Sequence, residues 1–259
     1  MPDRAKPLPV SNDLLPSSPL RRKLSAWTPL SAKELETVEA LAIDPRTVAG
    51  DRDIVTEGYR YDSVFVLLEG VAIRYRVLRD GRRQILNVVL PGDFVGFPGC
   101  FFDTALYSIT ALTDTAVSAV PFAELFHLFE RQPRIAAAIM WLFSCEAAMF
   151  AERLIGVGRR SAIERVAHFL LELLTRLRVI GMAEQNSFRM PLTQEKIGDL
   201  IGLTGVHVSR TLRQLRDDGL VAIDGHQVTI KNLDGLSALA DFERTYLNHF
   251  RISGALFPE

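Results

Sequence analysis

Cysteine is scarce in this sequence. Two of the 259 residues are cysteines, Cys100 and Cys145, and they lie far apart without a C-x-x-C pair. The scarcity argues against a disulfide framework, a cysteine-ligated zinc site and a four-cysteine iron–sulfur cluster. It also fits a reducing compartment, and we therefore expect a cytoplasmic protein.

An excess of charge of one sign is lacking too. The chain has 30 Lys and Arg against 31 Asp and Glu, a net charge of −1. This argues against a globally basic nucleic-acid binder but leaves room for a local basic face. The remaining composition, 48% apolar with 15 Phe, supplies a sizeable core for two ordinary domains or one large one.

Long uninterrupted hydrophobic runs are also missing. The N-terminus has no apolar segment typical of a signal peptide. The most apolar stretches, around 135–150 and 169–174, contain Ser144, Glu146 and Glu172. Because they look too short and too interrupted to cross a bilayer, we expect no membrane partner.

The N-terminal half changes character near residue 47. Five prolines in residues 1–26 predict a mobile tail, followed by a short helix that a Ser31–Glu34 capping box starts. From 47 to 120, glycines at 50, 58, 70, 81 and 92 separate β-branched runs, and the last strand pair is expected at 107–111 and 116–120. This spacing predicts a β-sandwich or barrel, with a type I′ hairpin at Asp80-Gly81.

A long apolar helix is predicted after Pro133. Its 4,3 spacing gives a seam of the coiled-coil kind. We expect one side to pack on the β-block and the other on a second copy of the chain, a buried helix of a monomer being the alternative. Gly156 and Gly158 predict a break and a hinge, and a second capping box, Ser161–Glu164, starts a helix that runs to about Arg178. The seam residues are Ala136, Met140, Phe143, Ala147, Phe150, Leu154 and Val157.

Residues 191–230 predict a winged helix-turn-helix. Thr193 caps a short helix over 194–201, a Gly-containing turn follows, and Thr204 caps a second helix over 205–218. A tight hairpin over 220–230 completes the pattern. In the second helix Val208, Leu212 and Leu215 recur at core spacing, so His207, Arg210 and their neighbours face outward, where they could reach phosphates or guanine edges.

This order of elements resembles the Crp/Fnr family of bacterial transcription regulators over roughly residues 28–240. The segments 192–202, 204–212 and 91–96 carry the resemblance. It implies an α+β fold: an N-terminal β-roll sensor domain (double-stranded β-helix or jelly-roll-like), a long dimerisation helix and a C-terminal winged helix-turn-helix. The implied ranges are a tail at 1–27, the cyclic-nucleotide-binding-like domain at 28–132, helix and hinge at 133–160, the DNA-binding domain at 161–245 and a tail at 246–259.

The resemblance also implies partners and residue roles. The partners are a second copy of the chain, double-stranded DNA with a pseudo-palindromic operator, and RNA polymerase. Arg210 falls on the family's base-reading arginine, but the recognition glutamate falls on Val206, which could touch a thymine methyl instead. His207 could donate to a phosphate. The candidate DNA-binding residues are Thr193, Gln194, Thr204, Gly205, Val206, His207, Ser209, Arg210 and Arg213.

The candidate effector pocket lacks the charges that a nucleotide needs. From Gln84 to Glu130 there is no Lys or Arg, and strand alternation directs Arg74 and Arg76 outward. A buried phosphate would be left without a cation, so cyclic AMP is kept only as an alternative. The family's iron–sulfur branch needs cysteines near the N-terminus, and none precedes Cys100, which could itself be redox-sensitive. Two possibilities remain: an unknown effector that binds in an aromatic pocket, or no effector at all. The pocket residues are Gly96, Phe97, Pro98, Gly99, Cys100 and Tyr107.

Two other classes of protein compete with this interpretation. A cupin-like metal enzyme needs two or three converging histidines, and residues 47–120 contain none. No nucleophile elbow or Walker loop is present either, so we expect no catalytic residue, metal or cofactor. A dimerising scaffold that never contacts DNA is the third class.

Overall fold

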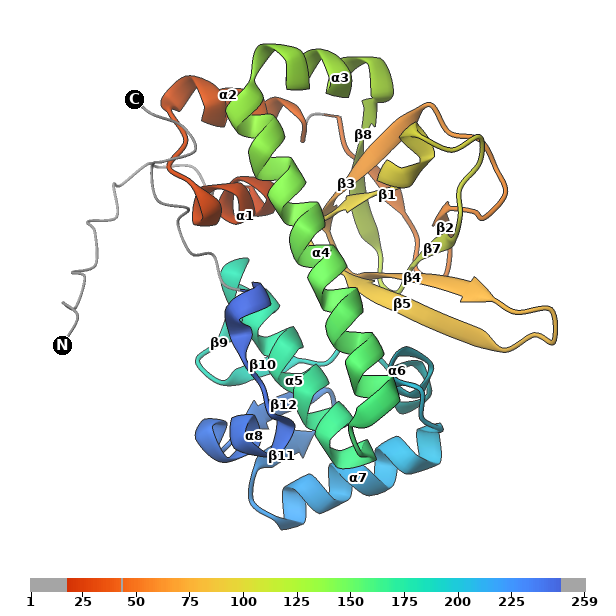
Figure 1. Ribbon diagram of the computed structural model, residues 1–259, viewed down its shortest axis with the longest axis vertical. Coiled ribbons are helices and arrows are strands. Elements are labelled where there is room, and N and C mark those ends of the chain that lie inside the picture. Colours follow the sequence, from red (N-terminus) through yellow and green to blue (C-terminus); the bar gives the residue numbers. More distant parts are fainter. Residues whose placement is uncertain (1–17, 43, 248–259) are drawn as a thin grey trace.

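The computed structural model describes residues 18–42 and 44–247. Figure 1 shows a β-roll beside a long helix that crosses the molecule, and a helical domain with a small sheet around the other end of that helix. The α+β fold expected from the sequence, with a β-roll, a long helix and a C-terminal winged helix-turn-helix, is confirmed.

Two four-stranded antiparallel sheets form the β-roll. Their inner faces bury a common apolar core that includes Ile54, Leu67 and Ile109. The predicted hairpin is confirmed, but its type I′ turn is wrong, because a longer loop closes it and only Gly81 needs a positive φ, +85°. One sheet orders β1 (Arg46–Val48), β8 (Thr115–Pro121), β3 (Ser63–Glu69) and β6 (Phe94–Val95); the other orders β2 (Asp53–Val55), β7 (Ser108–Ala111), β4 (Ala72–Val77) and β5 (Arg83–Val89).

The described end of the predicted N-terminal tail is a helix, so that prediction is wrong for residues 18–27. Ser18 accepts a hydrogen bond from the Arg21 N–H at 3.2 Å and starts α1 (Pro19–Trp27). Leu20 and Leu24, one turn apart, are fully buried. The α1 helix packs against the long helix over 133–159 and against the helix over 162–179. Residues 1–17 lie outside the described part of the chain.

The close approach of α1 explains one glycine of the β-roll. Gly92 has a φ of +84°, and a Cβ there would lie 2.8 Å from the backbone of Pro19. The turn at 91–96, one of the segments that carry the family resemblance, therefore packs against the start of α1. The capping box Ser31–Glu34 is confirmed at the start of α2 (Ala32–Ala40).

Arg74 points inward, which contradicts the outward orientation expected from strand alternation. Arg74 lies in the part of β4 that faces the long helix over 133–159, where it pairs with Glu146, whereas Arg76 lies two residues further along the hairpin, where the strand extends into solvent. The Arg74 side chain is 3% exposed, whereas Arg76 is exposed and pairs with Glu57.

The long helix α4 (Pro133–Arg159) follows α3 (Phe122–Arg131) and runs through both glycines that were expected to break it. Its hydrogen bonding continues to the Arg160 N–H, which donates to the Gly156 carbonyl oxygen at 3.1 Å. A helical glycine costs only about 1 kcal/mol, which the packing on either side of α4 offsets. The chain turns at Arg160, and the Ser161–Glu164 capping box starts α5 (Ala162–Val179) as predicted.

By length and composition α4 could cross a membrane, so the expectation that its apolar stretch is too short is wrong. Its polar side chains, however, pair with neighbouring elements. Arg134 contacts Glu34 of α2, Glu146 contacts Arg74 of β4, and Arg153 contacts Glu172 of α5. The helix is thus built into the protein on several sides.

The C-terminal domain contains the predicted winged helix-turn-helix. Helices α6 (Gln194–Ile201) and α7 (Gly205–Asp217) precede the hairpin β11 (Val221–Asp224) and β12 (Gln227–Ile230). Two short strands that were not expected from the sequence, β9 (Ala183–Glu184) and β10 (Ser187–Arg189), extend the hairpin into a four-stranded sheet. After α8 (Leu233–Ala240) and η2 (Arg244–Leu247), Leu247 is buried against α4 and α5, so the predicted tail is wrong for residues 246–247. Residues 248–259 are not among those described.

Candidate nucleic-acid interface

Helices α6 and α7 meet through a tight turn that small residues permit. A Cβ on Gly198 would lie 2.5 Å from the Leu203 carbonyl oxygen, and Gly202 ends α6 with a φ of +70°. The Leu203 N–H donates to the Gly198 carbonyl oxygen at 3.0 Å. This packing fixes the orientation of α7 on α6.

One face of α7 is solvent-exposed and carries basic and polar groups. Val208, Leu212 and Leu215 are buried as predicted, together with Thr211. The predicted recognition residues Val206, His207, Ser209, Arg210 and Arg213 are all exposed, Val206 to 61%. Neither Arg210 nor Arg213 has a side-chain partner among residues 18–42 and 44–247, so their donors are available.

The remaining predicted DNA-binding residues lie at the two helix starts. The Thr193 hydroxyl accepts from the Lys196 N–H at 3.3 Å and the Thr204 hydroxyl from the His207 N–H at 3.2 Å. Each hydroxyl keeps its own proton for donation outward. Gln194 is exposed, while Gly205 is half-buried where α7 approaches α6.

The predicted dimer seam on α4 divides into an exposed stripe and an inward-facing part. Leu154 is 74% and Met140 52% exposed, and Ala147 and Val157 are exposed as well. Phe143 turns the other way and stacks on Phe97 of the β-roll, with ring centroids 4.0 Å apart. Ala136 and Phe150 are half-buried. The exposed stripe that runs along the helix at 4,3 spacing is Met140, Ser144, Ala147, Ala151, Leu154 and Gly158.

The predicted effector residues do not line one pocket. Gly96, with a φ of +82°, leads into the 3-10 turn η1 (Phe97–Cys100), which contains Pro98 and Gly99. Phe97 packs on Phe143, and Cys100 is half-buried in the same apolar cluster. Tyr107 lies apart from them, beneath the Arg74 guanidinium at 4.6 Å from its ring centroid.

Arg74 reaches the interior, but its charge is already paired. Its guanidinium contacts Glu146 of α4 at 2.8 Å, and Asn87 donates to the same carboxylate at 3.0 Å. Burial alone would lower the pKa of Arg74, and Glu146 outweighs it and raises the pKa. Arg74, the inward-pointing cation of the β4–β5 hairpin, is therefore already paired with α4 and is not available for a phosphate. The cyclic AMP alternative gains no support from it.

Cys100 is expected to be an unreactive thiol. Burial raises its pKa to about 11, which leaves about one thiolate in 3,000 at pH 7.5. Iodoacetamide should therefore alkylate Cys100 about a hundredfold more slowly than a thiol placed at exposed Ala123 by an Ala123→Cys change. Peptide mass spectrometry over time measures both rates, and alkylation at equal rates would restore the redox-sensor alternative.

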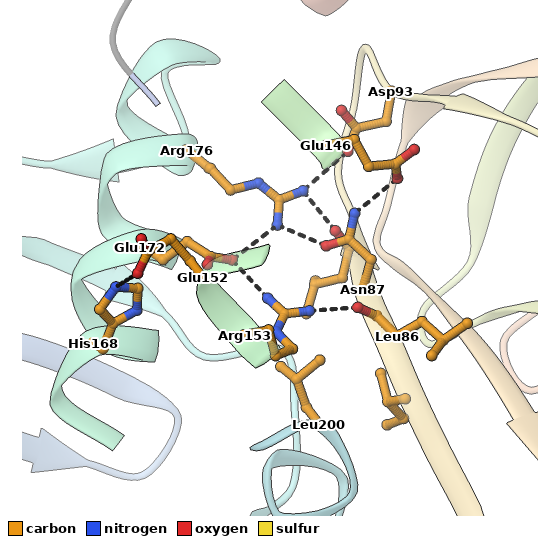
Figure 2. A network of polar contacts seen from close by, with 12 residues as sticks. Leu86, Asn87, Asp93, Glu146, Glu152, Arg153, His168, Glu172, Arg176 and Leu200 are labelled. Atoms are coloured by element: carbon orange, nitrogen blue, oxygen red, sulfur yellow. Dashed lines mark hydrogen bonds and ion pairs between the residues drawn. The ribbon is translucent and has the colours of Figure 1, made fainter. Parts of the chain in front are cut away.

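A polar network joins the β-roll to α5. Arg176 of α5 donates to the Val88 carbonyl oxygen of β5 at 2.6 Å and to Asp93 of the β5–β6 turn at 3.2 Å. Figure 2 shows Arg176 pointing toward Asp93 and Asn87. Asp93 also accepts from Lys23 of α1 at 2.5 Å. Three segments far apart in the sequence are thus held at one carboxylate.

The network continues along α4 toward the C-terminal domain. Arg153 donates to the Leu86 carbonyl oxygen and pairs with Glu172 of α5 at 2.9 Å (Figure 2). Further along β5, Arg83 pairs with Asp199 of α6 at 2.7 Å. The helix-turn-helix is therefore fixed to the β-roll by charged side chains, which sequence reasoning did not find. An arginine within the leucine-rich run of α5 was the available sequence signal.

Asp93 should stabilise the fold most at neutral pH. Burial would raise its pKa, but Lys23 and Arg176 hold the pKa below its ordinary 3.8. Its stabilisation is therefore fully present above that value and is lost as the pH falls from it through the lower pKa of the folded state. Asp93→Asn should lower the free energy of unfolding by about 3 kcal/mol at pH 7 and progressively less below about pH 4. Urea titrations measure this; Asp103→Asn, at a 91% exposed side chain, is the control, and a pH-independent loss would contradict the prediction.

The architecture defines the class of protein: a regulator in which a β-roll is joined through a long helix to a winged helix-turn-helix for DNA binding. Comparisons with known proteins agree. A cyclic nucleotide-binding domain matches residues 45–132, and a Crp-like helix-turn-helix domain matches residues 164–239. Among solved structures, FixK2 from Bradyrhizobium japonicum superposes with a TM-score of 0.68 and 29% identity, over 76% of this chain and 96% of that one.

Curated relatives give the family. The transcriptional activatory protein AadR of Rhodopseudomonas palustris is 36% identical over 182 residues, 68% of this chain and 74% of that protein. The transcriptional activator protein FnrL of Cereibacter sphaeroides is 30% identical over 202 residues, 77% and 80% of the two chains. The chain belongs to the Crp/Fnr family of DNA-binding transcription regulators.

Proposed function

We propose that this regulator binds a pseudo-palindromic operator as a homodimer, with α7 of each copy in a major groove. The observation that carries this proposal is the exposed face of α7, on which Arg210 and Arg213 have no side-chain partner among the described residues. Two such helices related by a two-fold axis read half-sites about one helical turn apart.

The residues of α7 have separate roles in this proposal. Arg210, one turn from the start of the helix, donates to a guanine edge, the commonest specific contact of an arginine. Val206 precedes it by one turn on the same face, and its exposed methyl groups suit a thymine methyl. Thr193, Gln194, Thr204, His207, Ser209 and Arg213, with the Gly205 N–H, donate to the phosphate backbone.

The exposed stripe of α4 is the proposed dimer interface. Its alternating large and small side chains permit close packing of two parallel helices, and burial removes Met140 and Leu154 from water. Within each copy the polar network transmits any change in the β-roll to the helix-turn-helix, through α5 and α6 rather than through a hinge at the two glycines. The signal that acts on the β-roll is an unidentified effector, or the regulator is constitutive.

We also infer a cytoplasmic location and a contact with RNA polymerase, because AadR and FnrL are activators of transcription by name. The proposed domains are the sensor domain with α1, from residue 18 to 132, the dimerisation helix at 133–160 and the DNA-binding domain at 161–247. Stimulated transcription by purified RNA polymerase from a template with the operator upstream would support the polymerase contact, and unchanged transcription would contradict it.

Salt dependence tests the DNA-binding proposal directly. The protein is used to enrich duplexes from a random library, and affinity for the enriched duplex is measured by fluorescence anisotropy. Each phosphate contact releases counterions, so the affinity should fall by about a thousandfold between about 50 and 200 mM salt. The enriched duplexes should contain two symmetric half-sites. A flat salt response, or enrichment of no common sequence, would overturn the proposal.

A further inference from the structure

A half-open cavity lies where α1, α4, α5, η2 and the β5–β6 turn meet, and none of the predicted effector residues lines it. Its volume is about 70 Å³. One end is polar, formed by the cations Lys23 and Arg176, the carboxylates Asp93 and Glu146 that pair with cations of the same network, and the Asn87 amide. The other end is apolar, formed mainly by Trp141, Leu142, Met149, Val179 and Leu247.

The polar end belongs to a buried network whose charges do not balance. Lys23–Asp93–Arg176–Glu172–Arg153 form one chain of ion pairs, and Asn87 connects it to the pair Arg74–Glu146. The network has four cations and three carboxylates, which leaves one positive charge in excess. An uncompensated charge away from water is costly, so an anion in the adjoining cavity would be stabilised.

Lys23 is the cation of the network with the least compensation. Its side chain is 8% exposed, and its ammonium group has three donors but contacts only Asp93 within the described part of the chain. Burial lowers the pKa of Lys23 more than the attraction of Asp93 raises it. By contrast, Arg176 has four partners: Asn87, the Val88 carbonyl oxygen, Asp93 and Glu172.

We propose that this cavity binds a small monocarboxylate, with its carboxylate on Lys23 and its short apolar body against Trp141 and Val179. The size of the cavity suits acetate or propionate, since an enclosed cavity of about 150 Å³ holds a benzene molecule. The apolar end favours a carboxylate with a methyl or ethyl group over an inorganic anion. The ligand would bridge α1, α4 and α5, and would tighten the junction between the β-roll and the DNA-binding domain.

The test is a titration of the full-length protein, without DNA, with acetate and with propionate. The indole ¹H–¹⁵N signal of Trp141 reports on the cavity from within it. Both carboxylates should give a saturable shift, and the uncharged propionamide should need at least about tenfold higher concentrations, since it lacks the charge-assisted contact. Nitrate serves as the inorganic anion.

Two variants locate the site. Lys23→Met should abolish the saturable shift, whereas Lys33→Met, at an exposed lysine of α2, should leave it unchanged. Val179→Phe fills the apolar end and should also abolish binding, without touching the charged network, which keeps the test decisive if Lys23→Met does not fold. Circular dichroism confirms that each variant is folded.

Three results would overturn the proposal: no saturable shift with either carboxylate, an equal response to propionamide, or undiminished binding in folded Lys23→Met or Val179→Phe. A saturable response to nitrate alone would overturn the assignment of a carboxylate. Because the titration contains no DNA, its failure would leave the proposed operator binding standing.

Discussion

Arg210→Ala should abolish specific operator binding while the protein remains a folded dimer. Arg210 is exposed on α7 and has no side-chain partner among the described residues, so its removal leaves no unpaired group behind. A bidentate arginine–guanine contact contributes about 1–3 kcal/mol, and a dimer loses two of them. We expect the affinity for the enriched operator to fall by at least about a hundredfold and the affinity for random duplex to change little.

The matched control is Arg216→Ala, which removes the same charge from the far end of the same helix. Fluorescence anisotropy with specific and random duplexes measures both variants. An equal, modest loss in both variants on both duplexes would show that α7 acts only through its charge. That result would place base recognition on other residues.

Leu154→Glu should convert the dimer to monomers. Leu154 is the most exposed apolar side chain of the α4 stripe, at 74%, and a second α4 would bury it together with its symmetry mate. Two carboxylates facing each other in an apolar seam lose hydration without gaining a partner, a cost of several kcal/mol. The dimer dissociation constant should rise by at least about a hundredfold, and operator binding should weaken with it because a monomer reaches one half-site.

Sedimentation velocity over a range of protein concentrations measures the change. Ala123→Glu, at an exposed position of α3 away from the stripe, is the control and should remain dimeric. A Leu154→Glu protein that sediments as a dimer would show that the two copies meet through another surface. Leu154→Glu should not unfold the single copy, since Leu154 is 74% exposed within it.

Periodic and local patterns could be predicted because they depend on near neighbours. The glycine spacing gave the β-roll strands, and the capping residues Ser31, Ser161, Thr193 and Thr204 gave the helix starts. The exposed and buried faces of α7 followed from its 3.6-residue period alone. The candidate DNA-recognition face was therefore available from the sequence.

Other features depended on contacts between segments far apart in the chain. The α1 helix has a sequence signal, Ser18 before Pro19, but the four prolines upstream favoured a tail. Its contacts with Gly92 and with α4 and α5 make it a fixed element. The glycines of α4 weaken a helix in isolation but do not end one that packs against several neighbouring elements. Arg74 was expected to point outward, and it is buried because Glu146 of the distant helix α4 pairs with it.

The sequence by itself determined the order of elements and the helix face proposed to meet DNA, because each depends on local spacing, and the segments 91–96, 192–202 and 204–212 carried the resemblance to the family. Only the tertiary structure decided what the sensor half contains. It turned Arg74 onto Glu146, separated Phe97 from Tyr107, and gathered Lys23, Asp93 and Arg176 beside a cavity that no motif predicts. Charges from four separate segments meet there because folding brings them together, and their balance can be counted only once they have met.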